Sequence, residues 1–266
     1  MATFPLPPTD WVVMSQEYQQ MFTMMQIPLV VLCAAFCIWG AVKHKSLVPI
    51  WLFLGGGIAY INEPFLNAVG LCWYPPEGMV SVFESIGRPV PLFGFLAYVW
   101  FFGGGCFLVY HLMSKGMTTA KIWRLYAILV VAETLLEIPG LNMEHVYTYY
   151  GNQPFVLFKF PVWWAFVNAG TPMVTGALVY KILPYIKTVF RPVTIYAVSL
   201  SNTMVMYGAG LPVVFTLNTD AGLLATHIAG AFTISLACFF IYVVTLLVAT
   251  DSRSASSGNS QSGAPA

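Results

Sequence analysis

Charged residues are scarce in this sequence. Asp, Glu, Lys and Arg make up 8% of its 266 residues, whereas hydrophobic residues make up 58%. A soluble domain carries about a quarter charged residues, so this composition excludes an ordinary water-exposed surface. The formal net charge of +1, with no basic patch interleaved with aromatic residues, argues against a nucleic-acid partner. We therefore expect an integral membrane protein that contacts membrane lipid.

The motifs of several metal, nucleotide and nucleophile chemistries are also missing. The sequence contains no GxSxG, no P-loop and no aspartate-rich pair that would bind a Mg²⁺-diphosphate. The last apolar run has no lysine, so a retinal Schiff base is unsupported. The histidines form no HxxxH or HxxHH box, and the cysteines show no metal-ligand spacing and no disulfide framework; these residues are His44, His111, His145, His227, Cys33, Cys37, Cys72, Cys106 and Cys238. We therefore expect neither a metal nor a cofactor.

What the chain does contain is a series of apolar runs. Each is long enough to cross a bilayer, which takes about 20 residues. The sequence predicts an all-α fold, a polytopic membrane bundle of about seven transmembrane helices in one domain over residues 21–250. Residues 1–20 are expected to form a polar N-terminal segment without signal-peptide features, and the Ser- and Gly-rich residues 251–266 a disordered cytoplasmic tail. The seven runs are 21–42, 47–69, 91–113, 121–141, 160–183, 191–215 and 221–249.

The basic residues predict the orientation of this bundle. With seven spans, the first, third and fifth loops and the C-terminus share one side, and nine of the eleven Lys and Arg residues fall there. Only Arg88 and Lys159 fall on the other side. The positive-inside rule then places the C-terminus in the cytoplasm and the N-terminus outside, in a multi-pass protein of the cell membrane.

Two loops on the predicted outer side are longer than a tight turn requires. Residues 70–90 and 142–159 are rich in aromatic residues and prolines. This composition suits structured lids at the membrane interface. It equally suits an aromatic belt that anchors the helix ends.

Three carboxylates lie within the predicted spans. Glu63 is followed directly by Pro64, which is expected to bend the second span. Glu133 and Glu137 are spaced i,i+4 in the fourth span, so both face the same side of the helix. Two ionised carboxylates at this spacing repel, and one of the pair is expected to hold a proton that it could donate. Ionisable groups at bilayer depth are costly and usually functional, and we take these three as candidate catalytic residues.

Further polar residues could join them in one cavity that opens outward. Asn67 lies one turn beyond Glu63, and Asn168 and Asn202 lie nearer the middle of the fifth and sixth spans. Asp220 lies at the outer start of the seventh span, with His227 two turns deeper on roughly the same face. Each has an ordinary explanation. Intramembrane Glu and Asn often hydrogen-bond a neighbouring helix, Asp220 could cap its helix, and His227 could be a satisfied buried histidine.

Several stretches resemble a known family. EPFLNAVGLCWYP, ESIGRPVPLFGFLAYVWFFGGG, WRLYAILVVAETLLEIPG and YGNQPFVLFKFPVWWAFVNAGTP are similar to the AveC-like spirocyclase proteins of actinobacteria, over roughly residues 60 to 185. The resemblance implies a polytopic membrane enzyme. It also implies spiroketal closure of a polyketide, in some cases followed by dehydration, which needs an acid and a base and no redox cofactor. It assigns no role to an individual residue.

The leading hypothesis is therefore a membrane cyclase or dehydratase that acts on a hydrophobic polyketide- or terpenoid-like small molecule. The substrate would enter from the bilayer and lie among Trp73, Tyr74, Trp163 and Trp164, whose rings could also stabilise a cationic intermediate. Alternatives are a membrane terpene cyclase, a proton-coupled transporter of a lipophilic molecule, and a non-catalytic partner in a biosynthetic complex. The sequence leaves the oligomeric state open.

Overall fold

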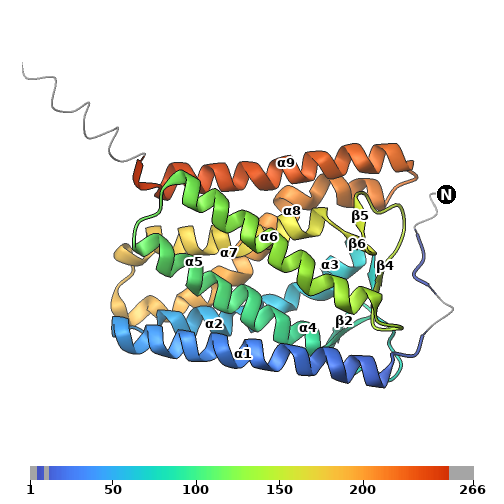
Figure 1. The fold of residues 1–266 in the computed structure, drawn as a ribbon, viewed down its shortest axis with the longest axis horizontal. Helices are drawn as coiled ribbons and strands as arrows, with labels where there is room; N and C mark the ends of the chain where they lie inside the picture. The colour runs from blue at the N-terminus through green and yellow to red at the C-terminus, as the bar shows by residue number, and fades with distance from the viewer. Residues whose placement is uncertain (1–4, 9–11, 252–266) are drawn as a thin grey trace, which may run out of the picture.

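The computed structural model describes residues 5–8 and 12–251 and consists mainly of helices that run alongside one another (Figure 1). Five of the described helical segments are long and apolar enough to cross a membrane, which supports the prediction of a membrane protein. They are Gln16–His44, Leu92–Ser114, Thr119–Asn142, Thr188–Leu217 and Leu223–Val248. The predicted disordered tail lies outside the described residues except for Asp251, whose carboxylate accepts a hydrogen bond from the Thr119 backbone (3.2 Å).

The first helix, α1, covers Gln16–His44 and so begins five residues before the predicted run at 21. Ser15 explains the earlier start, because its side chain accepts a hydrogen bond from the Tyr18 amide (3.4 Å) and caps the helix. The residue before the cap is also tied down. The Met14 amide donates to the Glu77 carbonyl (2.8 Å), which joins the N-terminal segment to the loop at 70–90.

The second predicted run forms a broken helix. It consists of α2 (Val48–Ala59), a 3₁₀ turn (Tyr60–Asn62) and α3 (Glu63–Val69). The interruption lies directly before Pro64, whose ring lacks an N–H and clashes with the carbonyl one turn earlier. Glu63 and Asn67 therefore lie on a short separate helix whose direction is set by the break.

The third run contains an unusual turn. It is built from α4 (Leu92–Ala97), the wide π-helix η2 (Tyr98–Gly104) and α5 (Gly105–Ser114). Gly103 allows η2 to pack tightly on α2, since a Cβ at this position would lie 2.4 Å from the Phe53 carbonyl oxygen. π-helical turns are rare and frequently occur at functional sites.

Helix α7 (Trp163–Ile182) lies at the centre of the bundle. It packs against α5, α8 (Ile195–Leu217), α9 (Leu223–Val248) and α6 (Thr119–Asn142), and most of its residues are buried. Small residues such as Gly170 and Gly176 allow these neighbours to approach closely. Its polar and small residues make α7 less hydropathic than its neighbours, and it is not among the five long apolar helices. In Figure 1, α1 and α9 form opposite edges of the bundle.

The short strands gather at one end of the bundle (Figure 1). β2 (Ser81–Ser85) pairs with β3 (Arg88–Pro91), and β5 (Val156–Leu157) pairs with β6 (Phe160–Pro161), so each forms a local hairpin. A third pair joins the two long loops, because β1 (Cys72–Trp73) pairs with β4 (Thr148–Tyr149). Both aromatic loops are thus structured and attached to each other.

Candidate functional site

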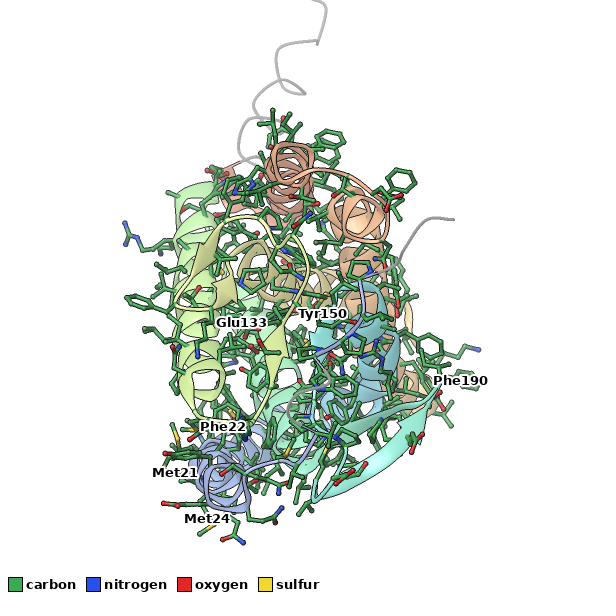
Figure 2. All side chains as sticks on the ribbon, turned by 90° about the vertical axis from the view of Figure 1, so that its right-hand side faces the viewer. Met21, Phe22, Met24, Glu133, Tyr150 and Phe190 are labelled. Atoms are coloured by element: carbon green, nitrogen blue, oxygen red, sulfur yellow. The ribbon has the colours of Figure 1, made fainter. Side chains whose placement is uncertain are left out.

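A cavity lies within the helices near the strand end of the bundle, and three i,i+4 pairs of side chains line it. The pairs are Glu63 and Asn67 from α3, Glu133 and Glu137 from α6, and Trp164 and Asn168 from α7. Residues four apart lie on the same helix face, so each helix presents one face to the cavity. Figure 2, viewed from the strand end, shows Glu133 in the interior, whereas Met21 and Met24 of α1 lie at the periphery.

Both oxygens of Glu63 accept hydrogen bonds from tyrosines. The Tyr74 hydroxyl donates to Oε1 (3.0 Å), and the Tyr98 hydroxyl donates to Oε2 (2.7 Å). Tyr74 follows β1 in the loop at 70–90, whereas Tyr98 is the first residue of the π-helix η2. Glu63 is 8% exposed, so these two bonds replace much of the hydration that its carboxylate loses on burial.

Glu133 and Glu137 have one side-chain donor each. Asn168 Nδ2 donates to Glu133 Oε1, and the Tyr147 hydroxyl donates to Glu137 Oε2 (2.8 Å). Glu133 is 3% exposed and Glu137 is half-buried. The two carboxylates come from positions one helical turn apart on α6, and both line the cavity.

Tyr74 and Tyr147, in the two long loops, stay protonated at neutral pH. Burial raises the pKa of Tyr74 well above its ordinary value, and the nearby Glu63 carboxylate raises it further. Burial and the Glu137 carboxylate act on the pKa of Tyr147 in the same direction. Both hydroxyls therefore remain hydrogen-bond donors to the carboxylates.

The remaining walls of the cavity are apolar. They include the rings of Phe22, Phe93, Phe101 and Phe102 and the side chain of Leu66. The free space is about 70 Å³. A buried water needs roughly 10–15 Å³ by this measure, so the space would hold about five waters. In this conformation the cavity is therefore narrow, and a ligand of polyketide size requires the walls or loops to move.

Five of the residues predicted for the site do not line this cavity. Trp163 directly precedes Trp164 on α7 but does not line the cavity, and its Nε1 donates to Gln153 Oε1 (3.2 Å). The Trp73 ring lies against the Arg88 guanidinium, 5.5 Å from the ring centroid. Each of these indoles packs against protein rather than facing the carboxylates.

The other three lie on α8, α9 and the turn between them. Asn202 accepts a hydrogen bond from Asn62 Nδ2 (2.8 Å) and donates to Thr171 Oγ1 (3.4 Å). Asp220 is exposed. His227 Nδ1 lies 2.8 Å from the Leu223 carbonyl oxygen, and its ring packs on Phe155. Polar residues from five spans were expected to line one cavity. Of the helical residues named from the sequence, only residues on α3, α6 and α7 do so.

Sequence reasoning missed several lining residues. Tyr98 lies in an apolar run with no local signal for a π-helix, and its contact with Glu63 depends on that geometry. Tyr147 and Tyr149 belong to the motif VYTYY, whose alternation could have indicated a short strand with both rings on one face.

Among residues 5–8 and 12–251, no group of three or more His, Cys, Asp or Glu side chains is placed to hold a metal ion. Comparison of the chain with protein-family models, curated proteins and solved structures gives no match.

Proposed function

We propose that the cavity is the active site of a membrane cyclase or dehydratase that uses carboxylate acid–base chemistry on a lipophilic small molecule. The observation that carries this proposal is the presence of three glutamates at one buried cavity, each with its own hydrogen-bond donor. Burying three carboxylates at one cavity costs free energy. A purely structural role needs each carboxylate to pair with a neighbouring helix, but it does not need all three at the same cavity.

The environments of the carboxylates suggest different roles. Glu63 accepts two tyrosine hydrogen bonds, which favour its ionised form and suit it as the general base. The Glu133–Glu137 pair holds the proton and serves as the general acid. In a dehydration, the acid protonates a leaving hydroxyl, the C–O bond breaks and water departs. Glu63 takes a proton from the adjacent carbon, whose electron pair forms the double bond.

The proposed setting is a bundle that crosses the cell membrane seven times, with the N-terminus outside. The broken α2–α3 segment and the central helix α7 would be the two spans in addition to the five long apolar helices. The uneven distribution of Lys and Arg supports this orientation, which places the cavity in the outer half of the membrane. The substrate would enter from the bilayer.

The polyketide class, and spiroketal closure in particular, rest on the resemblance to the AveC-like spirocyclases. That resemblance remains a prediction. The geometry is compatible with it because ketal closure requires the same acid and base. A terpenoid substrate remains the alternative, since aromatic walls can stabilise a carbocation.

Single Glu→Gln substitutions test the function. We expect Glu63→Gln, Glu133→Gln and Glu137→Gln each to lower product formation by about 10²- to 10⁴-fold, the usual contribution of a general acid or base. The lipid-soluble metabolites of the native host, followed by mass spectrometry, should show a precursor that is isomeric with the product or heavier by one water. Glu84→Gln, at an exposed loop position, is the control. Unchanged metabolite profiles in all three cavity variants would reject an enzymatic role.

A proton-coupled transporter is the second candidate, and one observation favours it. Thr171 lies three residues beyond Asn168 on α7 and accepts a hydrogen bond from Asn202, which in turn accepts one from Asn62. This chain of polar contacts joins α7 and α8 to the 3₁₀ turn that directly precedes Glu63. Transport predicts uptake into proteoliposomes that depends on a pH gradient, whereas catalysis in the cavity does not.

A further inference from the structure

Two buried hydrogen-bond donors at the cavity lack an acceptor. Asn67 Nδ2 of α3 and Trp164 Nε1 of α7 form no hydrogen bond with any residue that the structure describes. Both side chains line the cavity, and they are only 4% and 5% exposed. Proteins rarely leave buried donors unpaired, so two of them at one cavity require an explanation.

Four other side-chain donors at the cavity are paired with the carboxylates. Tyr74 and Tyr98 donate to Glu63, Tyr147 donates to Glu137 and Asn168 donates to Glu133. The Asn67 amide is near enough to Glu63 to act as a further donor to its carboxylate, but the distance and angle at its nitrogen do not meet those of a formed hydrogen bond. Each carboxylate thus has a hydrogen-bond donor other than Asn67 or Trp164. Neither of these two donors is needed to pair a carboxylate.

The neighbouring indole shows that an unpaired donor is not a general feature of this helix end. Trp163 stacks on Trp164 with ring centroids 4.2 Å apart, and its Nε1 donates to Gln153. Trp164, the next residue, is the one that lines the cavity and has no acceptor. Of these two stacked indoles, the one without a partner is therefore the one that lines the cavity. Three other unpaired buried nitrogens, Gln26 Nε2, Trp73 Nε1 and Arg191 Nε, lie outside the lining.

We propose that Asn67 and Trp164 bind an acceptor oxygen of the substrate, such as a ketone or ether oxygen, between α3 and α7. This inference rests on the proposed function only in taking the cavity as the substrate site. An apolar molecule that carries such an oxygen satisfies both donors, whereas a pure hydrocarbon leaves both unpaired and would be rejected on binding. The site therefore selects an oxygenated apolar substrate over a polyene.

A pair of matched probes tests this selectivity without turnover. 2-Decalone and 2-methylenedecalin have the same ring skeleton, and only the ketone offers an acceptor oxygen. Their dissociation constants are measured by equilibrium dialysis against the full chain in lipid nanodiscs, with empty nanodiscs as the blank. We expect the wild-type protein to bind the ketone about tenfold more tightly, the difference that a buried donor with and without an acceptor typically makes.

Substitutions then assign the preference to the two donors. Asn67→Leu and Trp164→Phe should each lower the ketone preference about three- to tenfold, with little change in the affinity for 2-methylenedecalin. Trp163→Phe, which removes the paired indole, should leave the preference intact. If Trp164→Phe does not fold, Asn67→Leu decides alone. The proposal is overturned if the wild-type protein shows no preference for the ketone, or if every folded variant of these two positions keeps it. A ketone preference in a protein whose Glu→Gln variants are fully active would instead reject the proposed catalysis and leave this binding site standing.

Discussion

At the scale of single residues, the tyrosine donors explain how Glu63 is tolerated in an apolar interior. Its two carboxylate oxygens accept hydrogen bonds from Tyr74, in the loop at 70–90, and from Tyr98 of the π-helix. The two hydrogen bonds fix the orientation of the carboxylate and also replace hydration that it loses on burial. A change at either tyrosine should therefore affect activity before it affects folding.

Tyr98→Phe should lower product formation about tenfold. It removes one hydrogen bond to a charged group, which is worth about 1.5–3 kcal/mol, and leaves the ring packing in place. Tyr60→Phe is the matched control, because the Tyr60 hydroxyl donates to the Pro91 carbonyl (2.7 Å), outside the cavity lining. We expect the control to lose stability while the folded fraction keeps its activity. Equal losses of activity in both variants would contradict a specific role for Tyr98.

The Glu133–Asn168 contact allows a separate prediction about stability. Asn168→Leu leaves Glu133 buried without its side-chain donor and should destabilise the protein by about 1–3 kcal/mol. The double variant Glu133→Leu/Asn168→Leu removes both partners and should recover most of that loss, since apolar replacement of a whole buried pair is often nearly neutral. Denaturant unfolding in micelles measures the cycle. A double variant that is less stable than Asn168→Leu alone would show that the pair stabilises the fold itself.

The candidate residues illustrate how far the sequence alone leads at this scale. Charged residues within the apolar runs identified Glu63, Glu133 and Glu137, and i,i+4 spacing placed Asn67 on the face of Glu63. The rotation of each helix about its axis could not be predicted from the sequence. The sequence therefore could not show that Trp164 lines the cavity and Trp163 does not.

At the scale of elements, the π-helix η2 and the break before α3 are the features that bring the site together. Tyr98 lies in η2, Glu63 is the first residue of α3 after the break, and the Tyr98 hydroxyl donates to the Glu63 carboxylate. Close packing of η2 on α2 requires glycine, since Gly103 lies against the Phe53 carbonyl and Gly56 against the Tyr98 carbonyl. The packing of η2 on α2 therefore controls the position of a tyrosine that touches Glu63.

Gly103→Ala should destabilise the protein by about 1–3 kcal/mol and reduce activity, because the added methyl group collides with backbone rather than with a flexible side chain. Gly105→Ala is the control two residues away. Its Cβ would lie 3.5 Å from Pro172 Cβ, an ordinary contact, so it should be neutral or slightly stabilising through helix propensity. Thermal unfolding of both variants in the same detergent compares them. Equal melting temperatures would show that η2 tolerates movement away from α2.

Hydropathy located the helices to within a few residues but not their internal irregularities. The predicted run 91–113 corresponds to the segment Leu92–Ser114, yet an apolar run carries no signal that distinguishes a π turn from an α turn. The break in the second run could be predicted from the sequence, because the ring of Pro64 has a known steric effect on the preceding helical turn. The earlier start of α1 followed from a capping serine at Ser15, a signal present in the sequence but weaker than hydropathy.

At the scale of the whole molecule, the proposed orientation places the strand end and its two joined loops outside the cell. The hairpin β2–β3 belongs to that end, and the turn before η4 (Thr188–Thr194) lies at the opposite, basic end. The sign of the charge distribution is the sole basis for this assignment. Accessibility to a reagent that cannot cross the membrane tests it directly.

A cysteine introduced as Glu84→Cys should react with a membrane-impermeant maleimide in intact cells. A cysteine introduced as Lys187→Cys should react only after the cells are permeabilised. Both positions are exposed, so burial does not confound the comparison. The unsubstituted chain provides the background from its own cysteines, which are buried or half-buried. The reverse labelling pattern would invert the orientation and place the cavity in the cytoplasmic half.

The distribution of the three i,i+4 pairs along the chain has a consequence for biogenesis. In the proposed seven-span arrangement, Glu63 and Glu133 enter the membrane before α7 leaves the ribosome, and Glu133 has no Asn168 to donate to it until then. A nascent chain at that stage must carry the carboxylate protonated or keep it at the translocon. Insertion of α7 is thus the step at which the half-made protein gains both its central helix and the donor for its most deeply buried acid. A stop codon after residue 162 should consequently yield a fragment that membrane quality control removes rapidly.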